Sequence, residues 1–203
     1  MSTPEFERWQ QRFSTPDYVF GTAPNAFLKS QAHLLRKGEK ALTIADGEGR
    51  NGVFLAEQGL DVLAVDFSPI AQDKARKLAA ERSVTLKFEQ ADITNWNWPE
   101  EAFDVVVGIF FQFVAPAERE KVFAGIKKAL KPGGLLLLEG YGPKQLEYKT
   151  GGPKILENLY TRELLEKAFS DFASLEVRAY DAEIHEGEGH GGMSALVDLV
   201  GRK

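Results

Sequence analysis

Residues 41–69 read ALTIADGEGRNGVFLAEQGLDVLAVDFSP, and this stretch decides the fold. Two apolar runs enclose a helical pattern, and Gly47, Gly49 and Gly52 follow the first run with the spacing G-x-G-x-x-G. Asp66 ends the second run. A strand, a glycine turn, a helix and a second strand ending in an acid are typical of nucleotide-binding α/β folds. The pattern suits NAD and other adenosine-containing cofactors equally.

The rest of the chain continues the alternation of strands and helices. Period-2 and buried apolar runs predict strands over 41–45, 61–67, 84–90, 103–110 and 133–141, and helical patterns cover 50–58, 69–83 and 116–130. A helix over 161–170 precedes two long strands, 173–184 and 193–203, joined by the glycine-rich residues 185–192. A short connection makes these two strands antiparallel. We therefore predict an α/β fold with a Rossmann-like, doubly wound, seven-stranded sheet, mostly parallel with an antiparallel C-terminal strand.

Composition limits the class of protein. The 203 residues are 43% hydrophobic and 27% charged, which is ordinary for one globular domain. We expect a helical lid segment over 1–38 and a sheet core over 39–203. A net charge of -5 argues against a nucleic-acid partner, and no apolar run reaches the roughly 18 residues of a membrane span. The absence of Cys and of an apolar N-terminal signal favours the cytoplasm. Monomer and homodimer stay equally open.

Three features favour an adenosine cofactor other than NAD. The chain closes with an antiparallel strand pair instead of a second mononucleotide-binding half, and none of its five tyrosines has Lys four residues later. Asp92 follows the third strand, where its carboxylate can accept from an adenine amino group while the amide of Ile93 donates to the ring. An NAD-dependent oxidoreductase therefore remains only as an alternative.

The ordered motifs carry a family resemblance. The succession IADGEGRNGVFLAEQG, VLAVDFSP, ADI, FDVVVG and LKPGGLLLLEGY resembles the class I S-adenosylmethionine-dependent methyltransferases, and more closely a small bacterial branch similar to the tellurite-resistance methyltransferases. YVFGTAPNAFL and HEGEGHGGMSALVDLVGRK resemble the two ends of that branch, so the likeness covers nearly the whole chain. It implies methyl transfer from S-adenosylmethionine to a small-molecule acceptor, with S-adenosylhomocysteine as product.

The resemblance also implies the cofactor-binding residues. They are Gly47 and Gly49 for the methionine and ribose portion, Asn51 at the helix start, Asp66 for the ribose hydroxyls, Phe67 against the adenine, Asp92 and Ile93 at the adenine edge, and Gly108 under the methionine part.

One part of the family pattern is missing. The usual acid-x-Gly-x-Gly-x-Gly has Thr43 in place of the acid and Ala45 in place of the first Gly. Asp46, inside the loop, is the candidate that replaces the acid, and a solvated turn residue is the alternative. The missing acid also leaves open a module that binds the cofactor without catalysis.

Acceptor and lid candidates lie at the carboxyl ends of the later strands and in the N-terminal segment. Phe110, Phe111 and Tyr141 are expected to wall an acceptor pocket, with core packing as the alternative for the two phenylalanines, and with His190 or Tyr141 as base if the acceptor needs one. The aromatic-rich N-terminal segment is interpreted as a lid, with Tyr18, Thr22 and Asn25 facing the site. His185 and His190 lack the spacing of a zinc pair, and we predict no metal.

Overall fold

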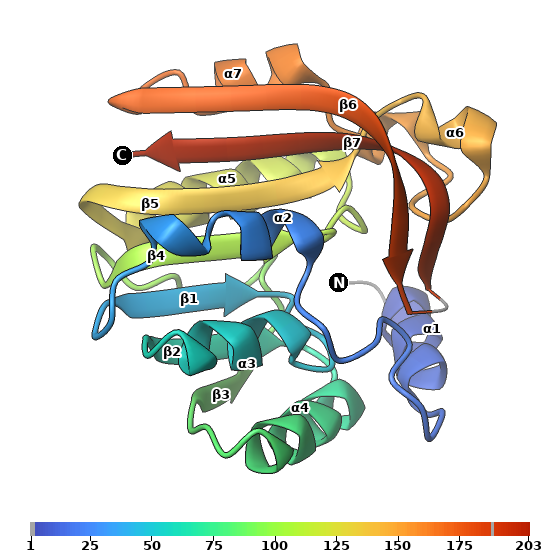
Figure 1. Cartoon of the computed structure of the whole chain (residues 1–203). Helices are drawn as coiled ribbons and strands as arrows, with labels where there is room; N and C mark the ends of the chain where they lie inside the picture. The colour runs from blue at the N-terminus through green and yellow to red at the C-terminus, as the bar shows by residue number, and fades with distance from the viewer. Residues whose placement is uncertain (1–2, 188) are drawn as a thin grey trace.

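The structure is a computed structural model and describes residues 3–187 and 189–203. Seven strands of this part form one sheet in the order β3-β2-β1-β4-β5-β7-β6 (Figure 1). They are β1 (Lys40–Ile44), β2 (Asp61–Asp66), β3 (Lys87–Gln90), β4 (Phe103–Ile109), β5 (Leu130–Tyr141), β6 (Ser174–Glu186) and β7 (His190–Arg202). The pairs from β3 to β5 are parallel, and β7 is antiparallel to both β5 and β6. The predicted fold class is confirmed.

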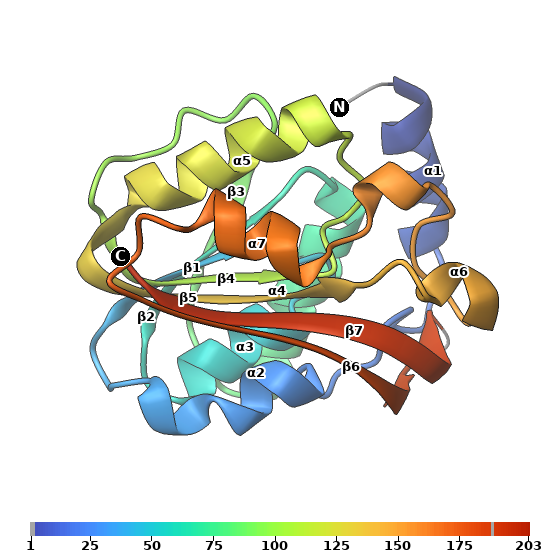
Figure 2. The ribbon, with the colours of Figure 1, turned by 90° about the horizontal axis from the view of Figure 1, so that it is seen from above.

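Helices cover both faces of the sheet. They are α1 (Thr3–Phe13), α2 (Ala26–Ser30), α3 (Arg50–Glu57), α4 (Pro69–Glu81), α5 (Pro116–Ala129), α6 (Gln145–Tyr148) and α7 (Arg162–Ala168), with 3-10 turns at Ala32–Leu34 and Leu156–Asn158. Seen from above, α2 and α3 lie on one side of the sheet, and α5 and α7 lie on the other (Figure 2).

Side-chain alternation on β5 divides the core between these two layers. Leu135 and Leu137 belong to the cluster packed with α2 and α3, whereas Leu136 and Leu138 belong to the cluster packed with α5 and α7. All four are at most 1% exposed. Successive strand residues point to opposite faces, so a strand covered by helices on both sides must be apolar throughout. This explains the unbroken run of four leucines.

Local sequence sets the start of α4 and the shape of the turn before α3. The Ser68 side chain accepts a hydrogen bond from the amide of Ala71, and Pro69 occupies the first helical turn, where its missing N–H costs little. Gly49 precedes α3 with a φ of 91°, in the left-handed region that favours glycine.

The last hairpin is longer than expected. Residues 185–192 were predicted to be a loop, but β6 continues to Glu186 and β7 begins at His190, with these two residues paired in the ladder. Gly187, with a φ of 67°, begins the reversal, and a short, sharp turn leaves the neighbouring residues free to pair. The far end of the hairpin bends toward α1, at the carboxyl end of the parallel strands (Figure 1).

The N-terminal segment is less helical than predicted. A loop of turns and bends, 14–25, separates α1 from the short α2. α1 lies at the carboxyl ends of the parallel strands, near α4 (Figure 1). In the described part of the chain, no helix has the length and apolar character needed to cross a membrane.

Candidate functional site

A pocket lies at the carboxyl ends of β1, β2 and β4. Sheet order changes direction between β1 and β4, which is the switch point where open α/β sheets bind ligands. The pocket is lined by the glycine loop and strand ends together with aromatic side chains from the N-terminal segment: Trp9, Phe13, Phe20, Ala45, Asp46, Gly47, Arg50, Asn51, Asp66, Phe67, Ile109, Phe110, Phe113 and His190. Five predicted cofactor-binding residues therefore meet in one cavity: Asp46, Gly47, Asn51, Asp66 and Phe67.

Asp46 is held in position by Thr43, which occupies the place of the acid in the usual sequence pattern. Thr43 Oγ1 donates to Asp46 Oδ1 at 2.8 Å, and the amide of Gly52 donates to the same oxygen at 3.0 Å. Asp46 Oδ2 is buried and has no hydrogen-bond partner among the described residues. Burial raises the pKa of Asp46 to about 6, against the opposing effect of the two hydrogen bonds and of Arg50. A buried carboxylate oxygen without a partner is costly, so Asp46 is suited to a cationic ligand group.

Asp66 joins β2 to the glycine loop. Its Oδ2 accepts from the amide of Gly47 and its Oδ1 from the amide of Ser68, both at 2.8 Å. Burial raises the pKa of Asp66 to about 7, although these two N–H groups lower it. Each carboxylate oxygen can accept more than one hydrogen bond, so ligand hydroxyls can still be bound.

The structure separates the two loop glycines that were predicted to face the cofactor. Gly47 lines the pocket, but Gly49 does not, and a Cβ at Gly49 would lie 2.5 Å from the Cβ of Ala75 on α4. A Cβ at Gly52 would lie 2.6 Å from Asp46 Oδ2. Gly49 therefore permits the approach of α4, and Gly52 leaves space for the Asp46 carboxylate. Ala45, where the family has Gly, takes a φ of 49°.

Three other predicted cofactor residues lie outside the pocket lining. Asp92 Oδ1 accepts from the amide and the hydroxyl of Thr94, and Ile93 is a core residue whose carbonyl accepts from the Trp98 indole. The space that a Cβ of Gly108 would fill is occupied by the Phe111 ring. Gly108 therefore allows close packing behind the pocket wall. The neighbouring strand-end residues Ile109 and Phe110 form that wall.

The N-terminal side chains that line the pocket are Trp9, Phe13 and Phe20, and the three that were predicted to face the site are not among them. Tyr18 donates to the carbonyl of Lys74 at 3.1 Å, and Thr22 is absent from the pocket lining. Asn25 caps α2, and its amide and side-chain polar atoms are engaged by Leu28, Asn51, Glu139 and Glu186. The aromatic content of the segment indicated a lid, but its folding decided which side chains face the pocket.

Glu48 attaches the lid segment to the glycine loop. It is 3% exposed, and its Oε2 accepts from the amide of Val19 at 2.8 Å while its Oε1 pairs with Lys74 Nζ at 2.7 Å. On the other side, the carbonyl of Val19 accepts from the amide of Gly189 in the hairpin turn at 2.9 Å. Phe20, next in the chain, is thereby fixed over the pocket.

His190 lies where the lid, β4 and the hairpin meet. Its ring centroid is 4.5 Å from that of Phe20, 4.4 Å from that of Phe110 and 5.6 Å from that of Tyr141. Burial lowers the pKa of His190, although Glu186 Oε2, 3.9 Å from Nδ1, raises it. The ring is therefore neutral near pH 7 and could accept a proton. The predicted grouping of Phe110, Tyr141 and His190 is found, but Phe111 is fully buried in the core and does not line the pocket.

Arg50 and Glu186 form a buried ion pair that sequence reasoning missed. Arg50 Nη2 lies 2.7 Å from Glu186 Oε2, and both side chains are 8% exposed. Burial raises the pKa of Glu186, but hydrogen bonds and the charge of Arg50 outweigh it and hold the value at about 2. The pair joins the start of α3 to the hairpin. Both residues lie in the motifs quoted from the sequence. They are 136 positions apart in the chain, however, so the sequence alone did not show that they form a pair. Among the described residues, no group of three His, Asp or Glu side chains could hold a metal ion.

Comparison with known proteins shows what this chain is similar to. Residues 41–134 match the family model described as "Methyltransferase domain". The sheet that surrounds this segment has the fold of solved S-adenosylmethionine-dependent methyltransferase structures, and these matches confirm the resemblance predicted from the sequence.

Individual proteins similar to this chain include methyltransferases. A demethylmenaquinone methyltransferase of Thermus thermophilus is 33% identical over 107 residues, 52% of this chain and 48% of that protein. TehB from Haemophilus influenzae has a TM-score of 0.75 at 18% identity, covering 98% of this chain and 67% of that one. A SAM-dependent methyltransferase from Methanosarcina mazei has a TM-score of 0.67 at 19% identity, covering 88% and 98%. The chain spans about half the length of the curated relatives it matches.

Proposed function

We propose that this protein is an S-adenosylmethionine-dependent methyltransferase that methylates a small-molecule acceptor. The observation that carries the proposal is the pair of buried carboxylates, Asp46 and Asp66, held by backbone amides of the glycine loop at the ends of β1 and β2. The matched methyltransferase domain, residues 41–134, contains both of them.

The residues of the pocket fit this cofactor. Asp46 Oδ2, which lacks a partner among the described residues, suits the cofactor's ammonium group, and Asp66 suits the ribose hydroxyls. Phe67, 8% exposed and flanked by Phe6 and Phe113, offers an apolar surface to the adenine. The pocket volume is about 70 Å³, well below the roughly 300 Å³ at which ligand pockets begin. The lid rings of Trp9, Phe13 and Phe20 must therefore move apart when the cofactor enters.

Bound S-adenosylmethionine supplies a methyl group already activated by the sulfonium. The chain's own residues then have three tasks: to orient the reactants, to exclude water and to receive a proton where the acceptor carries one. Phe20, Phe110 and Phe113 surround the junction beside His190 and keep it apolar. His190, neutral near pH 7, is the candidate base for an acceptor that is a hydroxyl or an amine. Asp92, Ile93 and Gly108 are not part of this set, and the cytoplasmic location stays a prediction.

Calorimetric titration and a methyl-transfer assay test the proposal. We expect S-adenosylhomocysteine to bind with 1:1 stoichiometry and NADH to release no binding heat. Binding of NADH without binding of S-adenosylhomocysteine would favour the oxidoreductase. Tight S-adenosylhomocysteine binding with no transfer to a broad panel of thiols, phenols and amines would favour a binding module without catalysis.

A further inference from the structure

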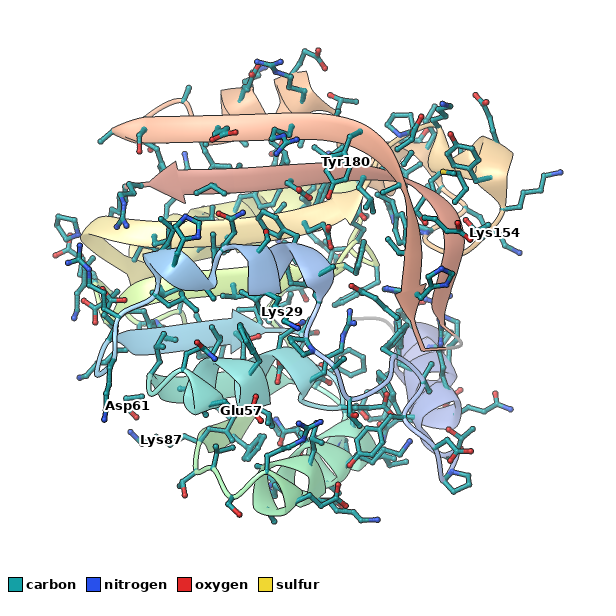
Figure 3. All side chains as sticks on the ribbon, viewed as in Figure 1. Lys29, Glu57, Asp61, Lys87, Lys154 and Tyr180 are labelled. Atoms are coloured by element: carbon teal, nitrogen blue, oxygen red, sulfur yellow. The ribbon has the colours of Figure 1, made fainter. Side chains whose placement is uncertain are left out.

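A second pocket adjoins the first and is the natural place for the acceptor. Its volume is about 150 Å³, and it shares Trp9, Phe110, Phe113 and His190 with the cofactor pocket. It is completed by Arg8, Arg12, Gln112, Tyr141, Gly151, Gly152, Pro153 and Gly189. A third hollow, of about 500 Å³, shares Gly151, Gly152 and Pro153 and continues outward past Lys149 and Lys154. Lys154 lies at the α6 end of the molecule (Figure 3).

The second pocket and the third hollow together form a route to the site, and the charge of this route is opposite to the net charge of the protein. The chain has 30 acidic and 25 basic residues. Among the described residues that line these two pockets, Arg8, Arg12, Lys149 and Lys154 are the charged ones, and Asp and Glu are absent. A concave surface with charges of one sign concentrates ligands of the opposite sign. The acceptor route therefore favours an anion.

Arg12 is the charge best placed to bind that anion. Its guanidinium lies 5.2 Å from the Trp9 ring centroid and 4.9 Å from that of Phe20, which fixes it over the pocket wall. No carboxylate in the described parts of the chain forms an ion pair with Arg12, whereas Arg8, one turn earlier, is paired with Glu5 at 2.5 Å. Burial and the neighbouring Arg8 both lower the pKa of Arg12, and a bound anion would offset both effects.

Tyr141 supplies a second polar group to the same pocket. The side chain is 1% exposed, and its hydroxyl has no hydrogen-bond partner among the described residues. The ring stacks on Phe110 with centroids 4.6 Å apart, so the hydroxyl is fixed in position. Burial raises the pKa of Tyr141 and keeps the hydroxyl protonated. Burying a hydroxyl without a partner is costly, and a ligand oxygen would offset that cost.

We propose that the methyl acceptor is a small organic anion with a flat apolar body, whose anionic group is bound by Arg12 and the Tyr141 hydroxyl. This inference rests on the proposed function and deepens it. Trp9, Phe110 and Phe113 enclose the apolar body, and the nucleophilic atom lies at the junction beside His190. The acceptor's lone pair forms the bond to the methyl carbon as the carbon–sulfur bond breaks, and that bond's electron pair returns to sulfur. A proton carried by the acceptor leaves to His190 or to water.

Two matched probes test the charge requirement. 4-Mercaptobenzoate and 4-mercaptobenzamide have the same ring and thiol and differ in the anionic group. We expect the wild type to methylate the benzoate with at least tenfold higher kcat/KM, because a hydrogen bond to a charged group contributes about 1.5–3 kcal/mol. Arg12→Gln should remove this preference by lowering kcat/KM for the benzoate alone. The control Arg162→Gln, exposed on α7, should keep it.

Binding measurements separate this inference from the proposed function. Titration of both probes into the protein, with and without S-adenosylhomocysteine, reports acceptor recognition even if no methyl group is transferred. Stronger binding of the benzoate that Arg12→Gln abolishes would support the anion site, whether or not the cofactor binds. Equal affinity for the two probes, equal loss of both in Arg12→Gln, or binding of neither would overturn it. Failure of S-adenosylhomocysteine to bind would instead refute the proposed function.

Discussion

Asp46→Asn should weaken cofactor binding and stabilise the free protein at the same time. Asn keeps an oxygen that can accept from Thr43 and Gly52, so the fold of the loop is preserved. It loses the charge that we assign to the cofactor's ammonium. Hydrogen bonds to charged groups contribute about 1.5–3 kcal/mol, so S-adenosylhomocysteine affinity should fall roughly 10- to 100-fold.

The opposite effect on stability follows from the raised pKa. Burial moves the pKa of Asp46 from 3.8 to about 6. Near pH 8 the charged carboxylate therefore destabilises the free protein by up to about 3 kcal/mol, at 1.36 kcal/mol for each pKa unit. Asn lacks this charge, and each kcal/mol gained should raise the melting temperature by about 2–4 °C. Isothermal titration and thermal unfolding at pH 8 measure both effects.

A matched control makes the result specific. Asp73→Asn removes a carboxylate whose side chain is 81% exposed, and it should change neither quantity. Unchanged S-adenosylhomocysteine affinity in Asp46→Asn would refute the assignment of Asp46 to the ammonium group. Loss of affinity together with a lower melting temperature would indicate damage to the loop and would contradict the reasoning from burial.

Four further predictions concern the glycine loop, the N-terminal segment and Asp66. Glu48→Gln breaks the buried pair with Lys74 and should cost about 3 kcal/mol of stability. It should also speed hydrogen exchange at the amides of residues 19 and 20. Unchanged exchange would count against the role of Glu48 in attaching the N-terminal segment to the glycine loop. Gly49→Ala should destabilise the protein by more than 1 kcal/mol, because its Cβ would clash with Ala75 and its φ is 91°; chemical denaturation that matches the wild type would contradict this. S-adenosylhomocysteine affinity should fall as pH drops through about 7, where Asp66 takes up a proton, by up to tenfold per unit, and a flat profile from pH 8 to 5.5 would argue against ionised Asp66 as the ribose ligand. The free protein should show the opposite trend: native Asp66 binds a proton that the unfolded chain releases near pH 3.8, so its contribution to stability is lost as pH rises toward 7.

Sequence patterns were sufficient to predict the sheet, because the spacing of apolar residues along a strand follows which side chains are buried. The leucine run of β5 and the acid at the end of β2 each indicated a position in the fold, and the short final connection required an antiparallel pair. Asp46 could also be chosen from the sequence. Thr43 stands where the usual pattern has an acid, and Asp46 is the nearby acid inside the loop. These inferences depend on neighbours close in the chain.

Side-chain direction was harder to predict, because it depends on contacts distant in sequence. Asn25 was expected at the site, but hydrogen bonds to Glu139 and Glu186 turn it into the protein interior. Gly49 fits the ligand-facing pattern, yet the approach of Ala75 on α4 decides its role. Arg12 had no motif at all, and only the placement of α1 over the strand ends brings it to the second pocket.

Calorimetric titration of the wild-type protein with S-adenosylhomocysteine, set beside the same titration with NADH, tests the central claim most directly. We expect 1:1 binding of S-adenosylhomocysteine that competes with S-adenosylmethionine, and no binding of NADH. Binding of NADH with no binding of S-adenosylhomocysteine would contradict it.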